Sequence, residues 1–149
     1  MANFKLWLVE SEEQDDIKKT LAELPKSHAD LVRGYTVKFQ GGNTMKGDES
    51  HIGMVDDQTK TITLAAPWRY PRSYTYLHEI GHLVWAHFVT PEMKKEWSRL
   101  ALRNKTENPQ NDEEEFCMSY AQHFANNKLI KYHLPERNRF VKTLVDNAR

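Results

Sequence analysis

The stretch His78-Glu79-Ile80-Gly81-His82 indicates both the fold and the chemistry of this chain. Histidines four positions apart lie one turn apart on the same face of an α-helix, so both imidazoles can reach one metal ion. The glutamate that follows the first histidine can act as a general base toward a water molecule beside that metal. Zinc lowers the pKa of such a water from about 15.7 to about 7, which makes a nucleophile available at neutral pH. The motif therefore predicts a zinc peptidase.

The residues around the motif favour a helix that is packed in the interior. Its flanks, Tyr76-Leu77 and Leu83-Val84-Trp85, are apolar, and Pro71 and Ser73 supply a helix start just upstream. The competing interpretation is a pair of buried histidines that are satisfied by core hydrogen bonds. That interpretation leaves Glu79 unexplained, because burying an unpaired carboxylate in an apolar helix is costly.

Composition and length exclude several classes of protein. The 149 residues suit one domain, 1–149, and Lys plus Arg (21) equals Asp plus Glu (21), so no net field favours nucleic acid or an acidic membrane. The single cysteine, Cys117, rules out an internal disulfide framework. No apolar stretch is long enough to cross a bilayer, and the segment from Phe4 to Val9 is too short for a signal-peptide core. We expect a cytoplasmic monomer whose partner is a peptide or protein substrate.

The spacing of apolar residues predicts strands first and helices afterwards, which is an α+β arrangement. Strands are expected at 3–9, 35–39, 51–55 and 60–65, the last two forming a hairpin, and polar loops at 41–50 and 104–111. Helices are expected at 11–24, 28–32, 73–88, from Pro91 onward, at 112–126 and at 135–147. The predicted fold is a small N-terminal mixed sheet whose edge strand packs on a C-terminal helical part carrying the motif.

A catalytic zinc site needs a third protein ligand and an open fourth position. Phe88 stands where a longer form of the motif would place a third histidine, so the ligand must come from elsewhere. The acidic run Asp112-Glu113-Glu114-Glu115, which opens the next apolar helix, supplies the candidates.

Successive helical residues differ in direction by about 100°, so only one glutamate of the run can point at the metal. Glu115 shares its face with polar residues and is expected to face solvent. Glu114 shares its face with Cys117, Met118, Ala121 and Ala125, most of which are small. Small residues allow a close approach to the motif helix, where Gly81 offers a matching notch. We therefore prefer Glu114 as the ligand, with Glu113 as the open alternative, and expect the other glutamates to interact only with the helix dipole.

The remaining histidines and the cysteine are weaker candidates for the metal. His87 is out of phase with His78 on the same helix and is expected to face away from the ion. The others are expected to be surface or core residues: His28, His51, His123 and His133. Cys117 is expected to pack as a small apolar side chain, close enough to the ligand face for its thiolate to interfere with the metal.

The histidine motif, followed by an acidic helix start, resembles the gluzincin branch of zinc peptidases. More narrowly, the segment from Asn111 to Cys117 is similar to the ligand helix of the anthrax lethal factor catalytic domain and its relatives. Their pattern is glutamate, any residue, phenylalanine, alanine, and here Cys117 replaces the alanine. Laid on this chain, the pattern again selects Glu114. The motif is also similar to that of phage and mobile-element metallopeptidases that cut repressors, which implies an origin of that kind.

The resemblance implies how a substrate is held. In the phage family an edge strand before the motif pairs with extended substrate backbone. The segment from Thr61 to Leu64 is similar to that strand, so Thr61 and Thr63 are the expected substrate-binding residues. The resemblance covers about Ile52 to Leu144 and is loose outside the two metal-binding helices.

This chain departs from the lethal factor pattern at one functional position. Those domains carry a tyrosine upstream of the glutamate ligand that stabilises the oxyanion, and Glu107 stands there in this sequence. The role would have to be filled by another tyrosine: Tyr70, Tyr74 or Tyr120.

The sequence thus predicts a zinc-dependent metalloendopeptidase with one catalytic zinc. His78, His82 and Glu114 hold the metal, and Glu79 is the general base. The alternative is a catalytically weak or inactive zinc-binding module that recognises a partner protein. The intact Glu79 argues against that module, and the missing tyrosine argues for it.

Overall fold

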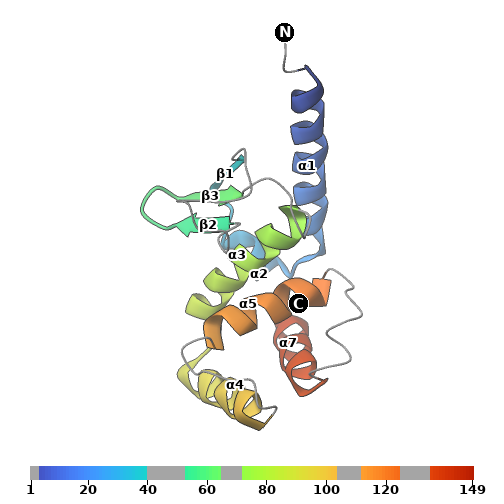
Figure 1. The fold of residues 1–149 in the computed structure, drawn as a ribbon. Helices are drawn as coiled ribbons and strands as arrows, with labels where there is room; N and C mark the ends of the chain where they lie inside the picture. Colours follow the sequence, from blue (N-terminus) through green and yellow to red (C-terminus); the bar gives the residue numbers. More distant parts are fainter. Residues whose placement is uncertain (1–3, 40–52, 65–71, 104–111, 125–134) are drawn as a thin grey trace.

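The computed structural model describes residues 4–39, 53–64, 72–103, 112–124 and 135–149 (Figure 1). In chain order the elements are α1 (Phe4–Glu23), α2 (Lys26–Asp30), β1 (Thr36–Phe39), β2 (Gly53–Asp56), β3 (Thr61–Leu64), α3 (Arg72–His87), α4 (Pro91–Arg103), α5 (Asp112–Phe124) and α7 (Pro135–Ala148). The fold is α+β, with a small mixed sheet followed by helices, as the sequence predicted. In the described ranges, no helix combines the length and apolar character needed to span a membrane. The predicted loops at 41–50 and 104–111 lie outside the described residues.

The sheet has the strand order β1-β3-β2. Strand β2 pairs antiparallel with β3, which confirms the predicted hairpin, whereas β1 pairs parallel with β3. The Asp56 carboxylate closes the hairpin turn by accepting hydrogen bonds from the backbone N–H groups of Gln58 and Thr59, at 2.9 and 3.2 Å. Lys60 completes the turn with a φ of 52°, in the left-handed region.

The prediction that an edge strand carries Thr61 and Thr63 is wrong. Strand β3 is the central strand, and its two sides pair with β1 and β2. Its backbone hydrogen bonds are therefore used within the sheet, so it has no free edge for a substrate strand. The hairpin of β2 and β3 was predicted correctly. The parallel pairing of β3 with β1 was not predicted, because it joins segments that are far apart in the sequence.

The strand predicted at 3–9 is also wrong, because those residues belong to helix α1. The predicted helix began at Ser11, whereas α1 begins at Phe4. Alternation of apolar residues over so short a stretch fits either structure, and no glycine or proline interrupts the chain before Pro25. The helix therefore continues through the good helix formers on both sides of Ser11.

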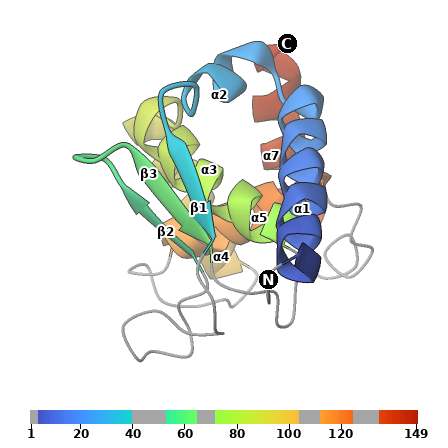
Figure 2. The same ribbon diagram turned by 90° about the horizontal axis from the view of Figure 1, so that it is seen from above.

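Helix α3 runs through the centre of the molecule and packs more extensively with α5 than with any other element described (Figure 1). Viewed from above, the sheet lies on one side of α3 and α1 on the other (Figure 2). The inner face of α3 is apolar and fully buried at Ile80 and Val84. Because Ile80 and Val84 face the core, the motif histidines on the opposite face of α3 point away from it.

Gly81 is the close point between α3 and α5. A Cβ atom added there would lie 2.9 Å from the Cα atom of Cys117 and 3.2 Å from its Sγ. The predicted notch is therefore confirmed, since only a glycine allows this approach.

Trp97 joins the other C-terminal helices to α5. Its ring is fully buried, and its Nε1 donates a 3.0 Å hydrogen bond to the backbone carbonyl of Asp112, the first residue of α5. Ring centroids of Phe116 and Phe140 lie 5.5 and 5.2 Å from it, at edge-to-face angles. Helix α5 is thus held from α4 and α7 as well as from α3.

The expectation that Glu115 faces solvent is wrong. Its carboxylate lies 2.6 Å from the guanidinium of Arg137 on α7, whose side chain is only 2% exposed. Arg137 also stacks over the Trp97 ring, 4.6 Å from its centroid. The polar face of α5 is buried against neighbouring elements at Ser119 and Gln122, so polarity did not mean exposure.

Candidate metal centre

Helix α3 brings the two motif histidines to one side, one turn apart. The ring centroids of His78 and His82 are 5.3 Å apart. Their side chains are 18% and 26% exposed, so they border solvent rather than the core. This exposure does not suit the interpretation in which both histidines are core residues.

Glu114 lies between the two histidines. One of its carboxylate oxygens is 3.0 Å from Nε2 of His78, and the other is 3.1 Å from Nε2 of His82. These contacts hold the pKa of the Glu114 carboxyl well below its ordinary value. The structure thus brings together the three residues that the sequence proposed as ligands.

The donor types in this cluster are ones that zinc takes. The 3.0 and 3.1 Å contacts run to different oxygens of Glu114 and are hydrogen-bond distances. The donor atoms that converge within 4.8 Å of one another are nitrogens of His78 and His82 and the Sγ of Cys117. Two imidazoles and one carboxylate are also a donor set of catalytic zinc sites.

Glu113 contacts the His82 imidazole at the ring nitrogen that Glu114 does not reach. Its carboxylate lies 3.0 Å from Nδ1 of His82. Burial lowers the pKa of His82, but hydrogen bonds with Cys117, Glu114 and Glu113 outweigh it and raise the pKa to about 12. The sequence analysis considered Glu113 only as an alternative ligand to Glu114. In the structure the two glutamates contact different nitrogens of His82, Glu113 at Nδ1 and Glu114 at Nε2.

Glu79 is 6% exposed and lies against strand β2. A Cβ atom built on Gly53 would meet Oε1 of Glu79 at 2.8 Å and Cγ2 of Thr75 at 2.7 Å. The bare backbone of Gly53 therefore leaves the room that the Glu79 carboxylate occupies. The sequence analysis missed Gly53, and the signal available was a glycine inside the strand predicted at 51–55, which often marks a close approach of another group to the backbone.

A cavity of about 810 Å³ lies between β2, α3 and α5. The two histidines, Glu79, Glu113 and Glu114 all line it, together with apolar side chains: Met54, Val55, Leu83, Ala86 and Met118. Polar groups that converge on a cavity with apolar walls are typical of small-molecule and peptide sites.

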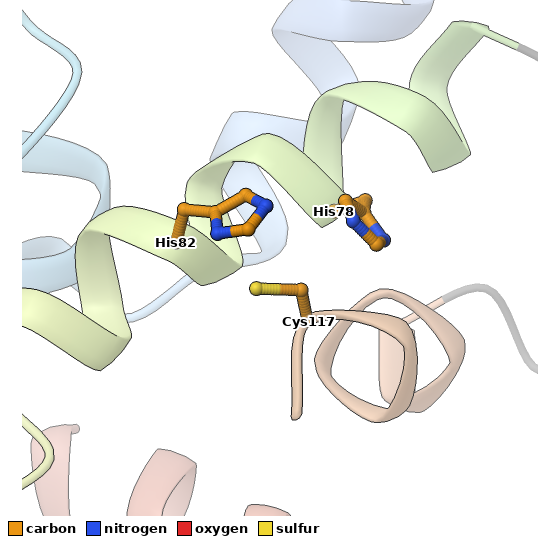
Figure 3. A group of neighbouring side chains, drawn as sticks. All are labelled: His78, His82 and Cys117. Atoms are coloured by element: carbon orange, nitrogen blue, oxygen red, sulfur yellow. The ribbon is translucent and has the colours of Figure 1, made fainter. Parts of the chain in front are cut away.

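Cys117 is a further donor beside the histidines. Its Sγ and nitrogen atoms of His78 and His82 all lie within 4.8 Å of one another, and the thiol points toward the His82 ring (Figure 3). Burial raises the pKa of this thiol to about 12. Cys117 is fully buried, as expected of a packing cysteine, but its Sγ also lies beside the two histidines.

The other candidates occupy different places. The Tyr120 hydroxyl is buried and hydrogen-bonds to Nδ1 of His28 at 2.9 Å, so it belongs to the core. Tyr74 lines the cavity, and its hydroxyl accepts a 3.0 Å hydrogen bond from Gln122. His87 lines the cavity at the end of α3. Tyr70, His51 and His133 lie outside the described residues.

Comparisons with protein-family models, with curated proteins and with solved structures gave no match to this chain. The assignment of function therefore depends on the site itself.

Proposed function

We propose that this protein is a zinc-dependent metalloendopeptidase of the gluzincin type. The observation that carries the proposal is the position of Glu114, whose two oxygens lie 3.0 and 3.1 Å from Nε2 of His78 and His82. His78, His82 and Glu114 would hold the ion, with a fourth position left for water or substrate. A zinc ion bound there would polarise a carbonyl group and acidify a water molecule.

Glu79 supplies the proton chemistry. As the residue after the first histidine ligand, it lines the same cavity, where it accepts the proton of the attacking water. It then donates that proton to the amine of the leaving group, so the carboxylate is regenerated at the end of each cycle.

Strand β2 is the proposed docking strand for substrate. It pairs with β3 on one side only among the described residues, and Gly53, Met54 and Val55 line the cavity. An extended peptide could add to this edge by backbone hydrogen bonds and pass in front of Glu79. This assignment replaces Thr61 and Thr63, which lie on the central strand.

The test is a peptide-library digest combined with metal analysis. Wild-type protein should bind about one zinc per chain and cleave peptides. Glu79→Gln should keep the zinc and lose cleavage, because the base is removed without a ligand. Absence of zinc from the wild type, with no thermal shift when zinc is added, would overturn the proposal.

A matched pair on α5 tests the ligand assignment. Glu114→Ala should lose most zinc affinity while the helices stay folded. Glu115→Ala should retain zinc affinity but lower the free energy of unfolding by about 3 kcal/mol, because it leaves Arg137 buried without its carboxylate partner. Zinc retained by the Glu114 variant would show that another residue completes the site.

The second candidate function is an inactive zinc-binding module that recognises a partner protein. Cys117 favours it, because a thiolate next to both histidines could occupy the fourth position and close the site to water. Cobalt substitution separates the two functions, since a thiolate ligand gives a charge-transfer band that Cys117→Ser would abolish. The band, together with no cleavage of any peptide, would favour the module.

A further inference from the structure

His82 has a carboxylate on each of its ring nitrogens. Glu113 lies 3.0 Å from Nδ1, and Glu114 lies 3.1 Å from Nε2. The two glutamates are neighbours on α5, yet they reach opposite sides of one imidazole. Of the two ring nitrogens of His82, Nε2 is the one beside Glu114, whose other oxygen contacts Nε2 of His78.

A histidine can bind a metal only through a nitrogen that carries no proton. A neutral imidazole has one proton, and a carboxylate that accepts it decides which nitrogen keeps it. When a metal displaces the proton from Nε2, the Glu113 carboxylate at 3.0 Å would hold the remaining proton on Nδ1, so the lone pair of Nε2 would be directed toward the ion. Carboxylates placed in this way also fix the orientation of the ring.

We propose that Glu113 is a positioning residue that fixes the tautomer and ring orientation of His82 for metal binding. The inference rests on the proposed zinc site and assigns Glu113 a role separate from that of the ligand Glu114. A second neighbour gives the role a purpose, because the Cys117 Sγ lies within 4.8 Å of the His82 nitrogen and points toward the ring (Figure 3). Without Glu113, the ring could turn toward the thiol.

The experiment measures zinc affinity by competition with a chromophoric chelator. Glu113→Ala should weaken zinc binding by about 10- to 100-fold. Glu113→Gln should recover part of that loss, since its amide carbonyl can still accept the Nδ1 proton, whereas the shorter Glu113→Asp should not. Glu92→Ala removes an exposed glutamate from the first turn of α4 and controls for the loss of a helix-dipole contact. This control should bind zinc like the wild type.

Nitrogen NMR of the zinc-loaded protein supplies a readout that a merely structural role would not change. The wild type should show His82 protonated at Nδ1 and bound through Nε2, and Glu113→Ala should show a mixture of ring states. Unchanged affinity in Glu113→Ala would overturn the proposal. A loss as complete as in Glu114→Ala would overturn it as well, since Glu113 would then be a ligand.

The outcome is separable from that of the proposed function. If the wild type binds zinc and cleaves nothing, the peptidase is refuted while the role of Glu113 is still decided by affinity. If the wild type binds no zinc, both proposals fail. If it cleaves peptides and Glu113→Ala binds zinc normally, only the positioning role fails.

Discussion

Substituting Gly81 by alanine tests how the two metal-binding helices are held together. The new Cβ atom would lie 2.9 Å from Cα of Cys117, whereas carbon atoms in contact are ordinarily about 3.5–4.0 Å apart. The nearest atom belongs to the backbone, so it cannot rotate away. Helix α5 must move from α3 by about 0.6 Å or more.

The magnitude follows from two opposing effects. Overpacking of this kind costs about 1–3 kcal/mol, and alanine recovers about 0.8–1.0 kcal/mol over glycine inside a helix. The metal-free protein should therefore lose about 1 kcal/mol of unfolding free energy. Zinc binding should suffer more, because Glu114 on α5 moves away from both histidines. If zinc must restore the strained geometry, the same 1–3 kcal/mol corresponds to about 5- to 150-fold weaker binding.

The assay is a chelator competition for zinc, with thermal melting in EDTA to follow the fold. Gly34→Ala is the matched control, because nothing lies within 4 Å of a Cβ atom at that position. The control should bind zinc normally and be neutral or slightly more stable. Wild-type zinc affinity in Gly81→Ala would refute the argument that this contact sets the ligand spacing.

Three further predictions follow from the structure. EDTA should lower the melting temperature without loss of helical circular dichroism, because apolar packing and not the metal holds α3 against α5; unfolding at room temperature on chelation would contradict this. Gly53→Ala should impair cleavage far more than zinc binding, because its Cβ would collide with Glu79 rather than with a ligand; equal kcat/KM for variant and wild type would contradict it. Burial, with a smaller contribution from Arg149, lowers the pKa of His28 to about 4, so folding favours the neutral ring. The contribution of His28 to the free energy of unfolding is therefore fully present above pH 6.5, and about 2–4 kcal/mol of it is lost as the pH falls toward 4. Denaturant titrations at several pH values should show a flatter profile in His28→Gln, and parallel profiles would count against the burial argument.

Local sequence patterns were sufficient for the helices that carry the site. The apolar residues around the motif predicted α3 to within a residue at each end, and the acidic start followed by apolar residues predicted the first residue of α5. The small residues along α5 also predicted the close approach at Gly81. These features depend on helical periodicity and on side-chain size, both of which are local.

Strand order could not be predicted in the same way. The turn at 56–59 identifies β2 and β3 as neighbours, because a hairpin is a local structure. The parallel partner of β3 is β1, which is separated from it by β2 and by residues outside the described ranges. No local pattern distinguishes a central strand of four residues from an edge strand, so Thr61 and Thr63 were assigned to the wrong place.

The error at Glu115 has a different physical origin. A helical wheel separates polar from apolar faces, but it does not identify what packs against them. Arg137 comes from a helix later in the chain and brings a buried positive charge to the polar face. Burial of that face is a tertiary effect, and the carboxylate is needed there because an unpaired buried guanidinium is costly.

The acidic run of α5 has a different partner for each member. Asp112 accepts hydrogen bonds from Trp97 and Ser98 of α4, Glu113 contacts His82, Glu114 contacts both histidines, and Glu115 pairs with Arg137 of α7. Because adjacent positions differ by about 100° around the helix, four consecutive residues can face three sides of the molecule. The start of α5 is thus fixed from α3, α4 and α7 at once. Metal sites tolerate displacements of only about 0.2 Å in ligand distance, far less than a fold tolerates before it unfolds. Loosening of α4 or α7 should therefore weaken metal binding before the protein loses its helices, and residues remote from the ion become determinants of its affinity.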